Sequence, residues 1–135
     1  MPRRDNMTNQ IKVLAIDDEV DFCYFIKKNL TQSGLFDVVV ANNGADGIKL
    51  ARKEKPDIIL LDLFMPDIPG EDVAAELKDH PATADIPILY ITALASNDEI
   101  VEGESNKMGD NYIMAKPVRT KKLIETIMKI LGQSY

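Results

Sequence analysis

The chain has 135 residues, the length of one domain, because two domains of half that size would each be too small to bury an adequate core. Its 22 acidic against 16 basic residues leave a net charge of −6, which argues against a protein that mainly grips nucleic-acid phosphates. The single cysteine, Cys23, excludes an internal disulfide and a thiolate zinc cluster, and no apolar run reaches the roughly 18 residues of a membrane span.

Five short apolar runs, rich in β-branched residues, alternate along the chain with longer stretches of helical periodicity. Because these runs are apolar on both faces, they are typical of strands in a parallel sheet that is buried between two helix layers. We expect strands at residues 11–16, 38–40, 58–61, 88–91 and 112–115.

Five helices are predicted in the stretches that follow these strands, because apolar residues recur there at helical spacing. The fourth helix is supported by Ser96 and Glu99, which have the spacing of a capping box, although Gly103 then interrupts it. The inward-facing residues of the other four are expected to be Phe22, Ile26 and Leu30; Ala45, Ile48 and Ala51; Val73 and Leu77; and Leu123, Ile127, Ile130 and Leu131.

Five strands that alternate with five helices predict an α/β fold, with a doubly wound five-stranded parallel sheet and helices on both faces. We expect one domain over residues 11–132, with a polar, flexible leader at 1–10 and a short tail at 133–135. In open sheets of this kind, functional residues lie beyond the carboxyl ends of the strands.

Reactive side chains stand where four of the five predicted strands end. Asp17 and Asp18 follow the first strand, Asp62 the third, Thr92 the fourth and Lys116 the fifth. Since the carboxyl ends of parallel strands meet at one edge, we expect these side chains to converge. Three close carboxylates repel each other unless a cation lies among them, and oxygen ligands favour Mg²⁺. An ammonium and a hydroxyl beside them suit phosphoryl oxygens, so the set predicts phosphoryl transfer onto a carboxylate.

Each of these residues also has an ordinary structural explanation. Asp17 or Asp18 could cap the first helix, and Asp62 could be a turn former at the end of a buried strand. A Thr at a strand end and a Lys-Pro pair at the start of a loop are both common. Their joint occurrence, in order and at the ends of the correct strands, favours the functional interpretation.

Four motifs carry a resemblance to a known family: LAIDDE at 14–19, LDLFMPDIPG at 61–70, ITA at 91–93 and KP at 116–117. In this order and spacing, the chain resembles a response-regulator receiver domain, the phosphoacceptor module of two-component signalling. The resemblance covers about residues 11–131, and it implies a flavodoxin-like sheet with the strand order 2-1-3-4-5.

The resemblance also implies a role for each residue at the strand ends. Asp62 would be the phosphoacceptor, which attacks the phosphorus of a phosphohistidine. Lys116 would pair with the phosphoryl oxygens, Thr92 would move to hydrogen-bond one of them, and the Lys116–Pro117 peptide bond would be cis. The implied ligands of Mg²⁺ are Asp18 and Asp62 directly, Asp17 through a water, and the backbone carbonyl of Phe64.

Two positions differ from the family's usual pattern. The aromatic switch residue three places before the Lys is replaced by Ile113, and Tyr112 is expected on the opposite face of the strand. Either Ile113 serves with a smaller movement, or Tyr112 takes part through a local bulge. Phe64, two residues after Asp62, would either line the approach of the hydrolytic water and slow the loss of phosphate, or point to solvent.

The expected partners follow from the resemblance. A sensor histidine kinase or a histidine phosphotransfer protein would donate the phosphoryl group, and a downstream protein would bind the fourth helix, fifth strand and fifth helix. The fourth-helix segment is acidic, with Lys107 its only basic residue, and the fifth helix is basic, which would suit a homodimer or a charged partner unless both are solvated faces. We expect a cytoplasmic protein without an output domain, and neither nucleic acid nor a membrane as a direct partner.

Three functions fit a site of this kind. We favour a signalling phosphoacceptor, which catalyses only its own phosphorylation and dephosphorylation. A degenerate receiver that serves as a binding module is disfavoured, because every acidic, Thr and Lys position is filled. A Mg²⁺-dependent phosphohydrolase of the haloacid dehalogenase type needs a second acid two residues after its nucleophile, where this chain has Phe64.

Overall fold

The computed structural model describes residues 9–93, 105–108 and 111–133. The strands are β1 Ile11–Ile16, β2 Phe36–Ala41, β3 Ile58–Leu61, β4 Ile88–Thr92, β5 Ser105–Met108 and β6 Asn111–Ala115. The helices are α1 Val20–Gln32, α2 Gly44–Glu54, α3 Gly70–Lys78 and α4 Thr120–Ile130. They correspond to four of the predicted helices, and the predicted fourth helix lies outside the described residues. Among the described helices, none combines the length and the apolar character that crossing a bilayer requires.

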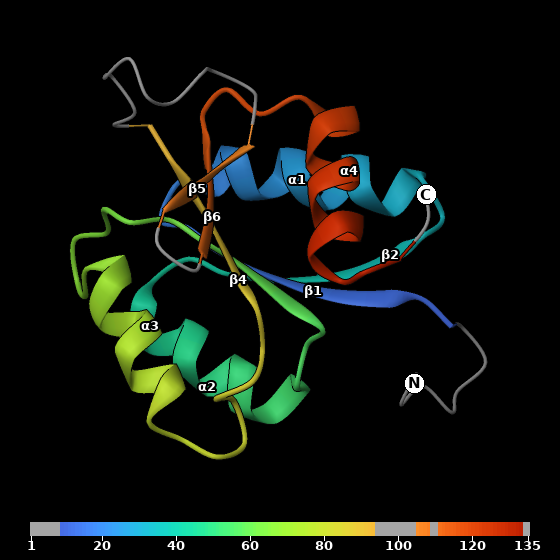
Figure 1. The fold of residues 1–135 in the computed structure, drawn as a ribbon. Helices are drawn as coiled ribbons and strands as arrows, with labels where there is room; N and C mark the ends of the chain where they lie inside the picture. Colours follow the sequence, from blue (N-terminus) through green and yellow to red (C-terminus); the bar gives the residue numbers. More distant parts are fainter. Residues whose placement is uncertain (1–8, 94–104, 109–110, 134–135) are drawn as a thin grey trace.

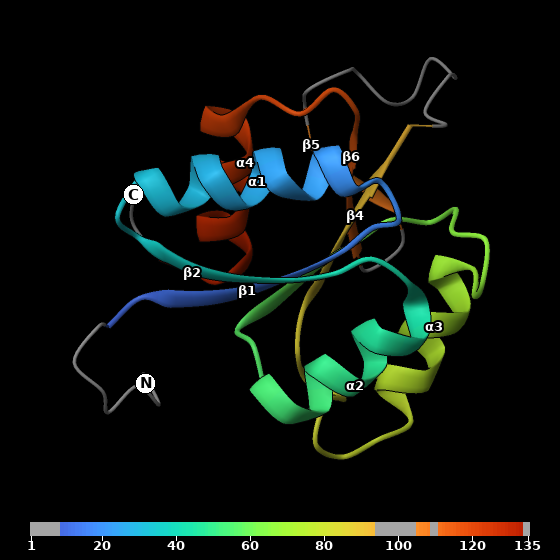
Figure 2. The same ribbon diagram turned by 180° about the vertical axis from the view of Figure 1, so that it is seen from behind.

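The sheet has the strand order β2-β1-β3-β4-β6-β5, and the first five strands in this order are parallel. These five are the predicted strands, so the predicted order 2-1-3-4-5 is confirmed, with β6 as the fifth of them. Helices α1 and α4 cover one face and α2 and α3 the other (Figure 1), and the view from behind shows the same layers (Figure 2). Parallel pairing brings the carboxyl ends of the five strands to one edge.

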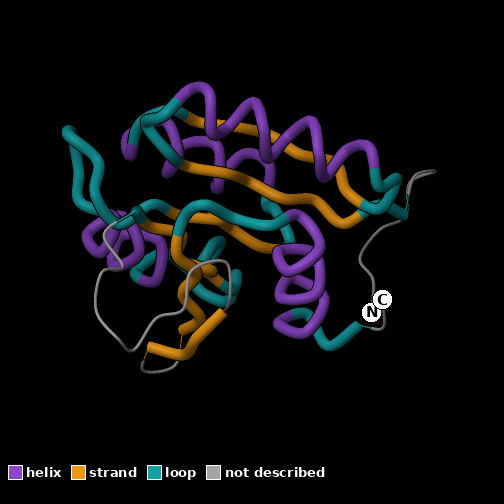
Figure 3. The backbone as a smooth tube through the Cα atoms, turned by 90° about the horizontal axis from the view of Figure 1, so that it is seen from above, coloured by secondary structure: helices purple, strands orange, loops and turns teal. Residues whose placement is uncertain are grey.

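An apolar cluster on each face of the sheet holds these layers together. The alternation of side chains along β1 divides its residues between the two clusters. Val13 and Ala15 pack with residues of α1 and α4, whereas Leu14 and Ile16 pack with residues of α2 and α3. Helix α1 runs roughly along β1 and β2 (Figure 3). Because β1 is buried on both sides, the position of its carboxyl end is fixed by packing.

Helix α2 packs against the sheet through glycines, and this corrects one prediction. Its buried residues are Gly44, Gly47 and Ala51, whereas Ala45, which was expected to face inward, is exposed. A methyl group on Gly47 would lie 2.6 Å from Cδ1 of Ile16, so glycine allows the helix to approach the sheet this closely. A search for apolar side chains overlooks such a stripe, because glycine has none.

The edge strand β5 was not predicted. It pairs antiparallel with β6, with Ser105 opposite Met114. Lys107 lies in this strand, so its assignment to the predicted fourth helix is wrong. Two residues, Gly109 and Asp110, separate the two strands in the sequence, and a two-residue connection that begins with glycine is typical of hairpins. The helical interpretation overlooked this signal.

Candidate functional site

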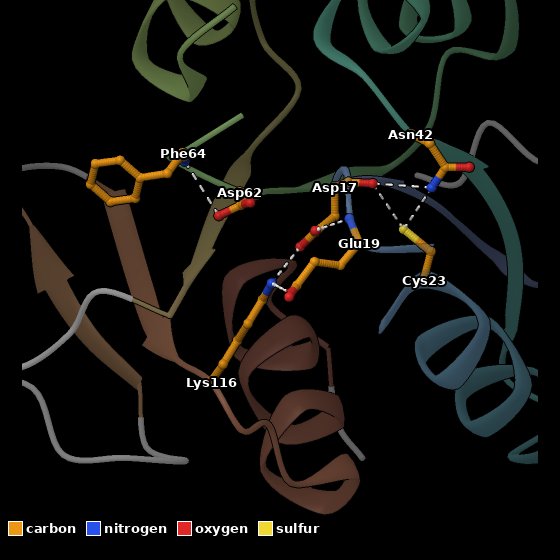
Figure 4. A network of polar contacts seen from close by, with 7 residues as sticks. All are labelled: Asp17, Glu19, Cys23, Asn42, Asp62, Phe64 and Lys116. Carbon is orange, nitrogen blue, oxygen red and sulfur yellow. Dashed lines mark hydrogen bonds and ion pairs between the residues drawn. The ribbon is translucent and has the colours of Figure 1, made fainter. Parts of the chain in front are cut away.

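Three carboxylates lie together at the carboxyl edge of the sheet. Asp17 and Asp18 follow β1, and Asp62 follows β3, the neighbouring strand. One oxygen from each carboxylate lies within 4.8 Å of the other two, and Figure 4 shows Asp17 and Asp62 side by side. Asp17 and Asp62 are only 3% and 5% exposed. The predicted meeting of these acids is confirmed, and two of them are largely removed from water.

Asp17 is held in place by hydrogen bonds from its own turn and from the end of β2. Its Oδ1 accepts the backbone N–H of Glu19 at 2.9 Å. Its backbone carbonyl accepts the side-chain amide of Asn42 at 3.1 Å and the thiol of Cys23 at 3.4 Å. Burial, together with the negative charge of Asp17, raises the pKa of Cys23 to about 12, so the thiol stays protonated as a donor.

Lys116 reaches the carboxylates from the end of β6 (Figure 4). Its Nζ lies 2.9 Å from Oδ2 of Asp17 and also donates a hydrogen bond to the carboxylate of Glu19. The same ammonium lies 4.3 Å from the centre of the Phe22 ring, at a distance typical of a cation–π contact. The peptide bond from Lys116 to Pro117 is cis, as the resemblance implies.

Negative charge exceeds positive charge at this edge. Burial, and after it the charge of Asp17, raises the pKa of Asp62 to about 6. Burial also raises the pKa of Asp17. Burial acts to lower the pKa of Lys116, but the hydrogen bond to Glu19 and the ion pair with Asp17 outweigh it and raise that pKa. The ammonium therefore stays charged, while the two buried carboxylates are costly to ionise together.

The site fits a hard divalent cation such as Mg²⁺. Its donor atoms are carboxylate oxygens, which Mg²⁺ prefers. Within the part of the chain that the structure describes, the buried Oδ2 of Asp17 is ion-paired with Lys116 but accepts no hydrogen bond of regular geometry. A divalent cation beside the carboxylates would offset the burial and the repulsion from Asp17 that raise the pKa of Asp62.

Two of the three carboxylates, those of Asp18 and Asp62, line a shallow depression of about 180 Å³. Its other lining residues are Glu19, Phe64, Ala93 and Lys116. The ring of Phe64 is 55% exposed and points away from the Asp62 carboxylate (Figure 4). The backbone N–H of Phe64 donates to Oδ1 of Asp62 at 3.4 Å. Thr92 ends β4 as a buried residue, and its carbonyl accepts the backbone N–H of Lys116 at 2.9 Å.

Comparison with known proteins identifies the family. Residues 13–128 match the family described as the response regulator receiver domain. The chain belongs to this family. Protein PilH of Pseudomonas aeruginosa is 32% identical to this receiver over 121 residues, which cover 90% of the chain and 98% of PilH. The polar-differentiation response regulator DivK of Brucella anthropi is 30% identical, with 90% and 96% covered. The alkaline phosphatase synthesis regulator PhoP of Bacillus subtilis is 32% identical, but the receiver spans only 49% of its length.

Solved structures share the fold of this receiver. A response regulator from Desulfuromonas acetoxidans superimposes with a TM-score of 0.75 at 27% identity, and the match covers 93% of this chain and 99% of that one. The chemotaxis protein CheY4 of Vibrio cholerae has a TM-score of 0.74 at 21% identity, with 90% and 98% covered. The second comparison supports the fold alone. The predicted doubly wound, flavodoxin-like fold is therefore confirmed.

The receiver site contains two polar contacts to which the sequence analysis gives no role. Glu19 binds the ammonium of Lys116, and Asn42 holds the backbone of Asp17. Glu19 completes a run of three acids, and Asn42 stands at the end of β2. The rule that functional residues follow the strand ends could have indicated Glu19 directly. It could have indicated Asn42 if it had been extended to uncharged side chains.

The position of the family's usual switch aromatic is occupied by Ile113, which is buried in the cluster on the face of α2 and α3. Tyr112 packs against the other cluster, and Nζ of Lys129 lies 5.4 Å from its ring centre. The two neighbours thus face opposite sides of the sheet, as predicted. Tyr90 shares the buried cluster of Ile113.

Proposed function

We propose that this receiver accepts a phosphoryl group from a phosphohistidine onto Asp62 and uses the acyl phosphate to switch its protein contacts. The observation that carries the proposal is the setting of the Asp62 carboxylate. It is buried at a strand end, lies beside two other acids, and lines a depression that Lys116 also lines. A poorly solvated carboxylate next to a cation is suited to nucleophilic attack. A sensor histidine kinase or a histidine phosphotransfer protein would be the donor.

In the proposed step, an oxygen of Asp62 bonds to phosphorus while the phosphorus–nitrogen bond of the donor breaks. The bonding electrons leave with that nitrogen. Because the other nitrogen of the donor ring already carries a proton, the imidazole departs neutral. Lys116 neutralises charge on the phosphoryl oxygens, and the hydroxyl of Thr92 donates to one of them. Bound Mg²⁺ would supply further charge neutralisation. Its proposed ligands are Asp18 and Asp62, Asp17 through a water, and the backbone carbonyl of Phe64.

Phosphorylation would act as a switch through charge. It would place a charge of about −1.5 to −2 where one carboxylate charge stood. Lys116 and Thr92, the proposed contacts of the phosphoryl group, end β6 and β4 and are joined by a backbone hydrogen bond. We assign the response to the surface of β6 and the basic helix α4, for a charged downstream protein or a second copy. The only reaction of the chain would then be its own phosphorylation and dephosphorylation, in the cytoplasm.

Incubation with acetyl phosphate and Mg²⁺ tests the proposal. Intact-protein mass spectrometry is expected to show the added mass of one phosphoryl group, none with Asp62→Ala, and none when a chelator removes the metal. Asp37→Ala, which changes an exposed acid of β2, is expected to gain the group like the wild type.

Two outcomes would contradict the phosphoacceptor proposal. If neither acetyl phosphate nor a phosphorylated histidine protein labels the wild type, the chain is a receiver that serves only as a binding module. If the protein turns over phosphate esters repeatedly, it is a phosphohydrolase.

Glu19→Gln is expected to accelerate labelling by acetyl phosphate about two- to fivefold, an effect in the range of a partly exposed ion pair. The carboxylate of Glu19 shares the ammonium that the incoming phosphoryl oxygens need, and it adds negative charge beside the depression. Glu76→Gln, which changes an exposed acid of α3 that is paired with Arg52 of α2, serves as the control. Equal rates in Glu19→Gln and the wild type would show that Glu19 does not compete for Lys116.

A further inference from the structure

The loop between β3 and α3 begins at Asp62 and contains Phe64, whose backbone carbonyl is a proposed ligand of Mg²⁺. One side chain ties this loop to a separate element. The carboxylate of Asp67 accepts the backbone N–H of Gly44 at 3.0 Å and that of Ala45 at 3.1 Å. These two residues begin α2, so Asp67 joins segments that are 23 and 22 residues apart in the sequence.

Helix α2 already has a cap of its own. Asn43, its N-cap residue, accepts the backbone N–H of Asp46 at 2.8 Å through its side chain. The carbonyl of Asn43 also accepts the N–H of Gly47 at 3.0 Å. Asn43 therefore provides the usual side-chain cap. The two bonds to Asp67 add a different effect, because they fix where the loop lies on the helix.

Close packing and a second bond restrain the loop on both sides of Phe64. A methyl group on Gly44 would lie 3.0 Å from Cβ of Ile68, so the start of α2 lies directly against the loop. At the far end of the loop, the N–H of Gly70 donates to the carbonyl of Leu63 at 2.8 Å. Phe64 thus lies between two fixed points in the sequence, Leu63 and the Asp67 contact.

The contact between Asp67 and α2 is charge-assisted. A carboxylate at a helix N-terminus meets the positive end of the helix dipole. It also accepts N–H groups that have no partner within the helix. The hydrogen bond from Gly44, together with the one from Ala45, holds the pKa of Asp67 below its ordinary value. The carboxylate therefore stays ionised at neutral pH, and its two bonds are of the stronger, charged kind.

We propose that Asp67 is a positioning residue for the cation site: it anchors the β3–α3 loop on α2 and so holds the Phe64 carbonyl in place for Mg²⁺. The inference rests on the proposed function. Groups that orient metal ligands without touching the metal typically affect affinity by about 10- to 100-fold. A residue that only stabilised the fold would leave the affinity of the folded protein unchanged.

Isothermal titration of Mg²⁺ into matched variants tests the role of Asp67. Asp67→Ala is expected to weaken Mg²⁺ binding about tenfold. Asp67→Asn keeps an oxygen that can accept the same N–H groups, so it is expected to recover most of the affinity. Asp57→Ala is the control. Asp57 also accepts a backbone N–H, that of Lys12 at 2.8 Å, but it directly precedes β3 and so lies at the amino-terminal end of that strand, away from the carboxylates. This variant is expected to bind Mg²⁺ like the wild type.

Amide hydrogen exchange supplies a readout that needs no metal. In Asp67→Ala, the amides of Gly44 and Ala45 are expected to exchange faster, while that of Asp46, which Asn43 binds, keeps its protection. If Asp67→Ala binds Mg²⁺ as tightly as the wild type, or if Asp57→Ala loses as much affinity, the positioning role is overturned. If Asp67→Ala does not fold, equal affinities of Asp67→Asn and Asp67→Glu overturn it, because the longer side chain cannot keep the same anchor. If the wild type binds no Mg²⁺, or Asp62→Asn binds it equally well, the proposed metal site itself fails.

Discussion

Asp62→Asn is expected to stabilise the metal-free protein by roughly 3 kcal/mol at pH 8 and by much less near pH 4. The pKa of Asp62 is raised from 3.8 to about 6 in the folded protein, first by burial and then by the charge of Asp17. The folded state therefore holds this proton more tightly than the unfolded chain. The stability that Asp62 contributes is full below pH 4 and is lost as the pH rises through 6, where the folded protein must carry a buried charge. Asparagine has no such charge to bury.

Urea unfolding at several pH values, with and without Mg²⁺, measures this effect. The gain in the free energy of unfolding of Asp62→Asn over the wild type should appear between pH 4 and pH 7. Mg²⁺ should reduce this gain, because the metal binds the wild-type carboxylates and stabilises only the folded state. Asp37→Asn, which changes an exposed acid on β2, serves as the control. A gain that is equally large at pH 4 and pH 8 would mean that the substitution acts through packing and not through charge.

This expected gain bears on the proposed function of the carboxylates at the ends of the strands. Asp17 and Asp62 are buried together beside one ammonium, an arrangement that costs folding free energy. In the proposed function the cost is offset when Mg²⁺ binds. In the same proposal, a change of charge at Asp62 would alter the interactions of Lys116, whose backbone N–H binds the carbonyl of Thr92 at the end of β4.

The residue set of this edge could be predicted from the sequence because each member follows an apolar run. Parallel strands that are buried on both faces produce such runs, and their carboxyl ends must meet. Asp17, Asp62 and Lys116 could therefore be brought together without knowledge of any distance. The partners of Lys116 could not, because its side chain is long enough to reach Asp17, Glu19 or Asp62. Only the folded geometry selects Asp17 and Glu19.

Other features were overlooked because they depend on backbone and not on apolar side chains. The inward stripe of α2 contains Gly44 and Gly47, which a hydrophobicity pattern does not register. The anchor at Asp67 is an exposed acid in a loop, and nothing in its local sequence indicates that the start of α2 lies against it. The edge strand β5 has only four residues and lies in a polar stretch, which gives little periodicity to detect.

Gly70→Ala is expected to destabilise the protein by more than about 3 kcal/mol, at the upper end of overpacking substitutions. A methyl group on Gly70 would overlap the backbone carbonyl oxygen of Asp62 and would lie 2.7 Å from Cα of Leu63. Backbone atoms cannot rotate away as a side chain can, so α3 must separate from the β3 end or Asp62 must shift. The folded fraction is therefore also expected to bind Mg²⁺ more weakly, since Asp62 is a proposed ligand.

Gly47→Ala provides the matched comparison, measured by urea unfolding under the same conditions. Its methyl group would meet Cδ1, Cγ2 and Cγ1 of Ile16, which are side-chain atoms and not backbone atoms. Both substitutions replace glycine in a helix by alanine, which has the higher helix propensity. This contribution to stability has the same sign in both variants, so it does not explain a difference between them. We expect Gly47→Ala to lose clearly less stability and to keep its Mg²⁺ affinity. If Gly70→Ala loses no more stability than Gly47→Ala and keeps its Mg²⁺ affinity, the start of α3 can move without disturbing Asp62, and this backbone contact does not hold the proposed phosphoacceptor.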